Sequence, residues 1–458
     1  MNAPFDPARL RRVLVYGLGL SGLAAARLLR RRGIEVVGVD RRQLAGEALG
    51  ALAGEPGFSA LLGREPDTLP PGVDAIVASP GVPVDRPVLA AARAAGLPVV
   101  AEVELAFRLL EGTVVAVTGS NGKSTVTAMT GTLLAGAGFP TEVCGNIGLP
   151  LCDVVDGAPG RVFVVELSSF QLEGISRFRP RAAALLNLSP DHLDRHGSLA
   201  AYLAAKQRVF ENQTAADVAV LNADETAVAE TPVAARRRLF SRRGPVIDGC
   251  YVEGGEVVEV APGQRPRRLF AVADVPVPGL HNLENAMAAA LLARAGGASV
   301  EAIAPALASY RGLPHRLERV RERGGVVFFD DSKGTNVAAT ERSLEGFADG
   351  SVHLILGGRN KGADLAYLAP MVERKARRIY LIGESAEAFE RALAAHAPFE
   401  RCGTLDRAIV SAAAAARPGE SVVLSPACAS FDQFRDYLHR GEEFKRLVRE
   451  LPAEVTVG

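Results

Sequence analysis

Short apolar runs rich in valine recur between residues 12 and 424, and each ends at a polar or glycine-containing turn. The run 114–117 shows the unit most clearly, because its β-branched residues stop at a glycine turn and an alanine- and leucine-bearing segment follows. Runs of this kind are typical of buried strands, and segments of helical period between them indicate crossover helices. The pattern predicts an α/β protein with open, mostly parallel sheets.

The turn at residues 119–122 and the helix that Lys123 begins predict a phosphate-binding loop. Successive N–H groups of a tight glycine turn can point at one anion, and the helix N-terminus adds partial positive charge. We expect Lys123 to reach the β/γ-phosphates of ATP and a following hydroxyl to ligate Mg²⁺. The first glycine stands closer to the lysine than in the usual P-loop, so an ordinary glycine turn is the alternative. The predicted ATP-binding loop is Gly119, Ser120, Asn121, Gly122, Lys123, Ser124 and Thr125.

A second nucleotide motif lies in residues 12–40. A strand is followed by glycines in GxGxxG spacing, and the next strand ends in Asp40, at the distance expected for an acid that contacts a ribose. A pyrophosphate at a helix N-terminus satisfies this pattern, so a UDP conjugate fits as well as NAD or FAD, and a structural glycine turn is the third alternative. The loop 79–83 after another strand supports a crevice. The predicted UDP-binding residues here are Gly17, Leu18, Gly19, Ser21, Gly22, Asp40, Arg41, Ser79, Pro80 and Gly81.

Polar residues at later strand ends are candidates for metal and substrate binding. Glu166 ends the run 161–166, where a carboxylate could hold the Mg²⁺ of ATP; a surface glutamate is the alternative. His192 stands at a strand-to-helix corner and could bind metal, hold substrate or cap a turn. Lys206 is by default a solvated helix lysine, because an ammonium beside Mg²⁺ is unfavourable. Asn282 could cap a helix, whereas an amide one turn later, Asn285, could read an adenine edge.

Residues 313–458 predict one further α/β domain. Three of its apolar runs end in polar loops, at 331–336, 359–362 and 425–434. Open sheets bind ligands at the carboxyl ends of their strands, so these loops are expected to form one site. Solvated loops are the alternative reading of each.

Composition limits the function classes. The chain has 458 residues, enough for about three domains. Lys plus Arg and Asp plus Glu both total 52, so no basic surplus favours nucleic acid or anionic lipid. Signal-peptide and bilayer-spanning patterns are lacking, and the five cysteines form no CxxC pair. We expect a cytoplasmic protein with reduced thiols and small-molecule substrates, without nucleic acid or membrane insertion.

Assembled along the chain, these motifs resemble the Mur ligase family of peptidoglycan-precursor synthesis. The shared motifs are GSNGKST, DHLDRHG, HNxxN at 281–285 and HRLE at 315–318. The members that add D-glutamate are resembled more closely, through GLGLSG at 17–22, GNIG at 145–148, ELSSFQLE at 166–173, DDSKGTN at 330–336 and SPACASFDQF at 425–434. The resemblance implies three domains: a Rossmann-like UDP-binding domain at 1–103, a central P-loop ATPase-type domain at 104–312 and a Rossmann-like amino-acid-binding domain at 313–458.

The resemblance also implies residue roles. Two Mg²⁺ ions would be held by Ser124, Glu166, His192 and Lys206, the last as a carbamate, which removes the electrostatic objection to it. The residues around adenosine would be Asn282, Asn285, His315, Arg316 and Asp331. Asn146 and Ser168 would face the muramoyl group. D-Glutamate would meet Thr335, Lys361, Ser430, Phe431 and Tyr437, where the family commonly has phenylalanine at the last position. The catalytic set would be Lys123, His192, Lys206 and Lys333.

The activity implied is ATP-dependent addition of D-glutamate to UDP-N-acetylmuramoyl-L-alanine by a monomer, through an acyl phosphate, giving ADP and phosphate. Three rivals are considered. A nicotinamide-dependent oxidoreductase leaves the second phosphate loop unexplained. Another amide ligase, such as folylpolyglutamate synthetase, should lack ELSSFQLE and the first domain, and a regulatory P-loop NTPase would hydrolyse ATP without ligation.

Overall fold

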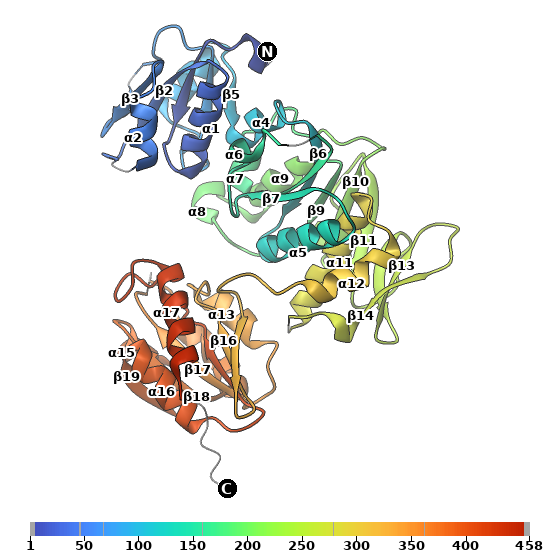
Figure 1. Cartoon of the computed structure of the whole chain (residues 1–458), viewed down its shortest axis with the longest axis vertical. Coiled ribbons are helices and arrows are strands. Elements are labelled where there is room, and N and C mark those ends of the chain that lie inside the picture. Colours follow the sequence, from blue (N-terminus) through green and yellow to red (C-terminus); the bar gives the residue numbers. More distant parts are fainter. Residues whose placement is uncertain are drawn as a thin grey trace. The chain divides into compact units, whose positions relative to one another are not determined.

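The computed structural model describes residues 5–44, 47–66, 68–157, 159–277, 279–360 and 362–452. The chain forms two compact units, Met1–Asp274 with Glu284–Ser309, and Val275–Leu283 with Tyr310–Gly458. Within the described ranges the first unit holds two sheets and the second unit holds one (Figure 1). No helix in those ranges is long and apolar enough to cross a membrane. The α/β prediction is confirmed.

The first sheet has five parallel strands in the order β3-β2-β1-β4-β5. Its strands are β1 (Arg12–Tyr16), β2 (Glu35–Asp40), β3 (Phe58–Leu62), β4 (Ala75–Ala78) and β5 (Val99–Ala101). Its helices are α1 (Leu20–Arg31), α2 (Glu47–Ala53), α3 (Pro87–Ala94) and α4 (Glu102–Phe107), with the 3₁₀ turn η1 (Pro7–Arg9) before β1. The strand order reverses between β1 and β4, and such a switch point opens a crevice at the carboxyl ends of the strands.

The second sheet has nine strands, and β6 lies inside it between β8 and β9. In sheet order the strands are β14 (Arg267–Ala271), β13 (Glu256–Val260), β12 (Gly249–Glu253), β11 (Arg236–Ser241), β10 (Val218–Asn222), β9 (Ala182–Leu185), β6 (Gly112–Thr118), β8 (Arg161–Glu166) and β7 (Thr141–Gly145). Only the pairs β12–β13 and β13–β14 are antiparallel among these.

The helices of this part contact the nine-stranded sheet and one another. They are α5 (Lys123–Gly136), α6 (Leu151–Val154), α7 (Ser169–Leu172), α8 (Leu193–His196), α9 (Leu199–Gln207), α10 (Thr226–Ala229), α11 (Leu280–Ala295) and α12 (Val300–Ser309), with 3₁₀ turns η2 (Arg208–Phe210) and η3 (Val272–Asp274). Helix α5 lies against β7, β8 and α12 (Figure 1). Because it is covered on more than one side, its buried positions are not confined to one stripe.

The third sheet has the order β15-β16-β20-β17-β18-β19, and only its edge strand β15 is antiparallel. The strands are β15 (Glu318–Arg323), β16 (Val326–Asp330), β17 (Val352–Gly357), β18 (Ala376–Ile382), β19 (Phe399–Gly403) and β20 (Ser421–Leu424). The helices are α13 (Val337–Leu344), α14 (Ala369–Lys375), α15 (Ala386–Leu393), α16 (Leu405–Ala415) and α17 (Tyr437–Glu450), with the 3₁₀ turn η4 (Leu365–Leu368). The three runs predicted to end in polar loops are β16, β17 and β20, which are neighbours, so their carboxyl ends meet at one edge.

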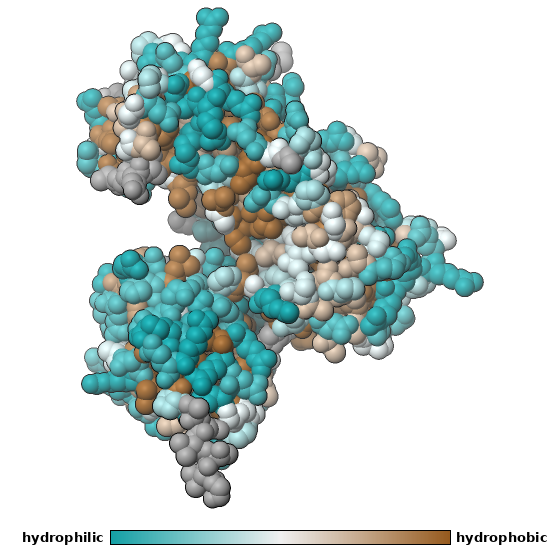
Figure 2. All heavy atoms as spheres, viewed as in Figure 1, coloured by the Kyte–Doolittle hydropathy of each residue, from teal (hydrophilic) through white to brown (hydrophobic). Residues whose placement is uncertain are grey.

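The central strands carry the cores. Every residue of β17 is buried, and the strand interior of β6 is buried from Val114 onward. Continuous burial is what both-sided helix cover requires of a parallel strand. In Figure 2 the face of the second unit that is in view is mostly hydrophilic, with single apolar side chains between, as expected for a sheet whose apolar residues are already covered.

The first glycine motif allows a matched stability test. A Cβ on Gly22 would lie 1.8 Å from the carbonyl oxygen of Gly17, which is backbone and cannot move aside, whereas a Cβ on Gly19 would meet nothing within 4 Å. We expect Gly22→Ala to destabilise the first unit by about 2 kcal/mol or more and Gly19→Ala by less than about 1 kcal/mol. Urea unfolding of both variants checks this, and equal midpoints would contradict it.

Candidate active site

The segment between β6 and α5 folds as the sequence predicts, as a strand, a glycine turn and a helix. Gly122 has φ 80°, a left-handed conformation that glycine adopts without strain, and it directly precedes the first residue of α5. The Nζ atom of Lys123 donates to the carbonyl oxygens of Gly119 and Ser120, each at 2.9 Å. The ammonium therefore lies over the turn.

Two residues after β9 brace this turn. The side chain of Asn187 accepts from the N–H of Asn121 at 2.8 Å and donates to its carbonyl at 3.1 Å. The hydroxyl of Ser120 donates to the carbonyl of Ser189 at 3.1 Å. Sequence analysis missed Asn187 and Ser189. Their signal is that they follow a buried strand, but only the pairing of β9 with β6 shows that they reach the turn.

Asn285 also lies against the turn, since a Cβ on Gly122 would come within 2.4 Å of its Oδ1. Asn282 lies one turn earlier, inside α11, so the interpretation of it as an N-cap is wrong. Ser124 is buried, and Thr125 is partly buried in the first turn of α5. The helix start and an amide from α11 are thus close to the same turn.

Glu166 ends β8, opposite Val117 of β6, and only 2% of its surface is exposed, so the alternative of a surface glutamate is excluded. Its Oε1 accepts from the Nδ2 atom of Asn146 at 2.8 Å, whereas Oε2 is buried without a hydrogen-bond partner among the described residues. A buried carboxylate oxygen without a donor is costly unless a cation lies beside it. The site therefore fits a divalent cation. Ser168, two residues on, caps α7 through a capping box with Gln171.

Lys206 is buried, so the expectation of a solvated helix lysine is wrong. Its Nζ donates to the carbonyl of Gly119 at 2.7 Å, which is the oxygen that Lys123 also uses, and lies 4.2 Å from the ring centroid of Tyr202. Burial and the neighbouring Lys123 ammonium lower the pKa of Lys206 to about 7. Near neutral pH, a large fraction of the Lys206 side chain is therefore in its neutral amine form.

His192 lies at the corner before α8 in a left-handed conformation, with φ 53°. Its imidazole is half-exposed, and Nε2 lies 3.5 Å from a carboxylate oxygen of Asp191. The ring centroid is 4.9 Å from that of Phe170 and 6.3 Å from that of Tyr202. The Tyr202 ring thus lies near both His192 and Lys206. Sequence analysis did not predict a role for Tyr202.

A crevice of about 430 Å³ opens at the switch point of the first sheet. Its walls include eight predicted residues, Gly17, Gly19, Ser21, Asp40, Arg41, Ser79, Pro80 and Gly81. Leu18 and Gly22 are buried beneath it and belong to the support of the crevice, not to its wall. Tyr16, Glu65 and Arg86 also line it and were not predicted.

Asp40 is held by its own neighbours. Its Oδ2 accepts from the N–H of Leu18 at 2.9 Å and from Arg42 at 3.0 Å. Although burial favours the neutral acid, the hydrogen bonds from Arg42 and Leu18 lower the pKa of Asp40 to about 2. The carboxylate fixes the glycine turn, in addition to any contact that it makes with a ribose.

We expect Asp40→Asn to lose about 1–2 kcal/mol of unfolding free energy at pH 7, because the Arg42 ion pair is lost. Asp40 has a folded pKa below its unfolded value of about 4, so its contribution is present above about pH 4 and is lost as the pH falls toward 2. Urea unfolding of wild type and variant at pH 7, 4 and 3 measures the difference. A gap that stays constant over this range would contradict the assignment.

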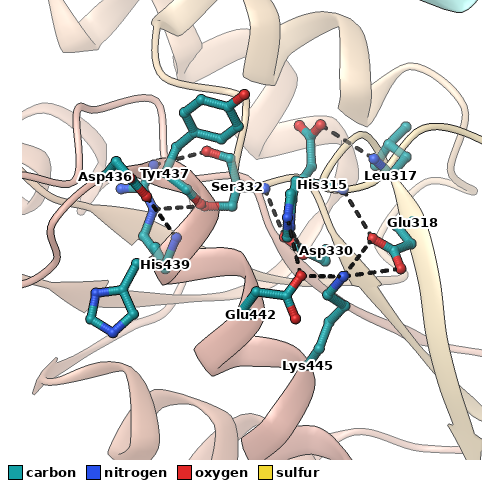
Figure 3. Close-up of polar contacts among 12 residues, drawn as sticks. His315, Leu317, Glu318, Asp330, Ser332, Asp436, Tyr437, His439, Glu442 and Lys445 are labelled. Atoms are coloured by element: carbon teal, nitrogen blue, oxygen red, sulfur yellow. Dashed lines mark hydrogen bonds and ion pairs between the residues drawn. The ribbon is translucent and has the colours of Figure 1, made fainter. Parts of the chain in front are cut away.

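In the second unit, His315 is held beside β16 in a left-handed conformation, φ 61°. Figure 3 shows its ring directed at Asp330, with Nδ1 2.6 Å from Oδ2. Its other ring nitrogen lies 3.4 Å from Glu442, and Lys445 bridges Glu442 and Glu318. His315, Glu318 and Asp330 have metal-like spacing, but Lys445 already supplies a cation to Glu318. Sequence analysis missed Asp330 and Lys445, which hold the predicted adenosine residue in place.

The loop after β16 is organised by buried hydrogen bonds. Asp331 accepts from the hydroxyls of Ser343 and Ser425, both at 2.7 Å, and burial raises its pKa to about 6. The N–H of Lys333 donates to the carbonyl of His315 at 3.1 Å, and its Nζ lies 5.5 Å from the ring centroid of Tyr437. The loop is therefore tied to both α13 and β20.

The predicted D-glutamate residues lie on this loop, on the loop after β20 and at the start of α17. Thr335 lies two residues after Lys333, Ser430 is buried and Phe431 is 60% exposed. Lys361 lies outside the described residues. Arg440, which was not predicted, is fully buried and donates to the carbonyls of Ser332 and Cys428, so it joins the two loops. Burial raises the pKa of Asp331, and the nearby positive charge of Arg316 opposes this rise in part.

Comparison with known proteins identifies the class. Family models described as "Mur ligase MurD-like, N-terminal domain", "Mur ligase middle domain" and "Mur ligase, glutamate ligase domain" match residues 11–101, 117–293 and 315–428. The chain belongs to the Mur ligase family.

Two relatives of the chain carry the name of one particular member of this family. The chain is 44% identical over 451 residues to the UDP-N-acetylmuramoylalanine--D-glutamate ligase of Acidobacterium capsulatum, covering 96% of each protein. It is 47% identical over 453 residues to the protein of the same name from Myxococcus xanthus, covering 96% of this chain and 98% of the relative.

Two solved structures are similar in fold. One is the MurF ligase of Thermotoga maritima in complex with ADP, with a TM-score of 0.60 and 17% identity over 97% of each chain. The other is a pseudomurein peptide ligase type C from Methanothermus fervidus, with a TM-score of 0.59 and 17% identity over 96% of this chain and 100% of that one. At such low identity they bear on the fold alone.

Proposed function

We propose that this protein is an ATP-dependent amide ligase of peptidoglycan-precursor synthesis that joins D-glutamate to UDP-N-acetylmuramoyl-L-alanine. The observation that carries the proposal is the 44–47% identity, along 96% of the chain, to relatives named for this activity. The crevice at the first switch point, the phosphate-type turn before α5 and the clustered loops after β16 and β20 support three ligand-binding regions.

In the first step the substrate carboxylate attacks the γ-phosphorus of ATP, and the bond to ADP breaks, giving an acyl phosphate. The N–H groups of the turn 119–122 and the Lys123 ammonium offset negative charge on the transferring group. Asn285 beside the turn, with Asn282, His315, Arg316 and Asp331, would surround adenosine. Lys333 would lie near the transferred phosphate.

In the second step the neutral amine of D-glutamate attacks the acyl carbon, and phosphate leaves with the bonding electron pair after a tetrahedral intermediate. Thr335, Lys361, Ser430, Phe431 and Tyr437 would hold the amino acid. Asn146 and Ser168 would orient the muramoyl group. Keeping the acyl phosphate away from water is required of this site, because hydrolysis would waste ATP.

Two Mg²⁺ ions are proposed, one with Ser124 and Glu166 and one with His192 and Lys206 carbamate. The Oε2 atom of Glu166, which has no hydrogen-bond partner among the described residues, supports the first site. The low pKa of Lys206 supports carbamylation, because a neutral amine is the form that adds to carbon dioxide. When bound, the ions supply charge neutralisation to the phosphoryl group.

We further propose domain limits at 1–103, 104–312 and 313–458. The first limit lies two residues after β5, inside α4, and the second lies five residues before β15. The protein would act in the cytoplasm, where ATP and UDP-linked precursors are available, and as a monomer.

The test is phosphate release from ATP with UDP-N-acetylmuramoyl-L-alanine and D-glutamate each omitted in turn, and mass detection of the amide product. Release that needs both substrates, with one amide per phosphate, is expected. ATP hydrolysis independent of the partners would indicate a regulatory NTPase, and hydride transfer to NAD would indicate an oxidoreductase; either result would overturn the proposal.

A further inference from the structure

Arg195, in α8, joins two parts of the first unit. Its Nη1 atom donates to the carbonyl of Pro80, in the loop after β4, at 2.9 Å. Nη2 donates to a carboxylate oxygen of Glu173, just after α7, at 2.7 Å. The guanidinium carbon lies 4.2 Å from the ring centroid of Phe170. With 19% of the side chain exposed, the guanidinium is held on three sides.

One end of this contact is the nucleotide crevice. Pro80 lines it, and its neighbour Ser79 donates its hydroxyl hydrogen to the carbonyl of Gly17 at 2.6 Å. The loop after β4 is therefore tied to the glycine turn of the first motif.

The other end of the Arg195 contact is Glu173, on the side of the proposed phosphate site. Glu173 ends the segment that begins with Glu166 and includes Ser168, and α8 follows His192 directly. Glu173 also lies 3.5 Å from Nδ1 of His196, so it has two cationic neighbours when that histidine is protonated. Arg195 thus connects the crevice loop to the segments that carry a proposed metal ligand and a proposed muramoyl contact.

Arginine suits this position for a geometric reason. Its planar guanidinium can donate in two directions and stack on an aromatic face at once, whereas the lysine ammonium is a compact charge on a flexible chain. Hydrogen bonds from a charged donor are about twice as strong as neutral ones. A lysine at 195 could keep one of the three contacts but not all.

We infer that Arg195 is a positioning residue that sets the span between the nucleotide crevice and the phosphate-loop site. The inference rests on the proposed function, because a UDP-linked substrate has to place its nucleotide in the first and its carboxylate at the second. Loss of the contact should weaken the binding of ligands that occupy both the crevice and the phosphate-loop site. The binding of ligands that occupy one of these sites should stay almost unchanged.

The test compares Arg195→Met and Arg195→Lys with Arg208→Lys. Arg208 is a matched control, since it donates to the carbonyls of Glu173 at 2.5 Å and Ile175 at 2.8 Å and pairs with Glu211. It therefore holds the same Glu173 segment as Arg195, but its hydrogen bonds are not with the loop after β4. For both Arg195 variants we expect KM for UDP-N-acetylmuramoyl-L-alanine to rise about tenfold. KM for ATP and for D-glutamate should stay within about twofold, as should all three constants of Arg208→Lys.

Calorimetric titration with UDP alone distinguishes a change in the span between the two sites from damage to the crevice itself. Wild type and Arg195→Met should bind UDP within about threefold of each other. An unchanged KM for the UDP-linked substrate, an equal rise in all three KM values, or a loss of UDP affinity as large as the rise in KM would each overturn the inference alone. Failure of wild type to form the amide would overturn the proposed function and the inference with it.

Discussion

We expect Lys123→Ala to lower kcat for ligation by about 10³-fold, because the transferring phosphoryl group loses a preorganised positive charge in a site of low dielectric. The lysine heads α5 and its ammonium already lies over the turn, bonded to the carbonyls of Gly119 and Ser120. ATP would replace these carbonyl contacts with phosphate contacts. Amide formation under saturating substrates measures the effect.

A matched control is a buried lysine outside the proposed site. Lys375 donates to the carbonyl of Phe347 at 2.6 Å and lies 2.7 Å from Asp349, so its contacts are internal to the second unit. Lys375→Met should keep kcat within about threefold although it lowers stability. Normal ligation by Lys123→Ala would remove the assignment of residues 119–125 as the ATP-phosphate loop.

Lys206→Ala should also lose about 10³-fold in kcat, and short carboxylates such as formate or acetate should restore part of it. The side chain is buried beside the phosphate turn, where an alanine leaves space for a small anion. A carboxylate supplied from solution would take the position of the carbamate oxygens. The measurement is the ligation rate as a function of added acid at constant ionic strength.

The two lysine variants serve as controls for each other. The same acids should not rescue Lys123→Ala, since an anion cannot replace an ammonium. Because the pKa of Lys206 is about 7, the amine that reacts with carbon dioxide predominates above this pH and is lost below it. Full activity of Lys206→Ala without added acid, or equal rescue of both variants, would exclude the carbamate role.

Features that depend on residues close in sequence could be predicted. The turn 119–122 lies between β6 and α5 as expected, and β2 ends at Asp40. The loops after β16, β17 and β20 were correctly expected at one sheet edge. Parallel strands joined by crossover helices all point the same way, so their carboxyl ends lie at one edge of the sheet. Predicting that edge requires only the assignment of the strands.

Features that depend on distant residues could not be predicted. Lys206 is buried because its helix packs against the turn after β6, where its ammonium donates to the carbonyl of Gly119. The default for a helix lysine in a sequence is exposure. Asp40 has a ribose-type position in sequence, but its carboxylate already accepts from the N–H of Leu18, in the glycine turn that follows β1. A protonation state follows from desolvation and neighbouring charges, which a linear pattern does not contain.

The sequence by itself determined the α/β class, the glycine turns and the family, because strand, turn and helix signals are local and the motifs extend along the whole chain. Only the tertiary structure decided that Lys123 and Lys206 share the Gly119 carbonyl and that Arg195 bonds to the Pro80 loop. It also decided that Glu166 keeps a buried oxygen without a hydrogen-bond partner in the part of the chain that the structure describes. Each of these facts depends on which distant segments the sheets bring together, and hydrophobic burial of the strands fixes that arrangement.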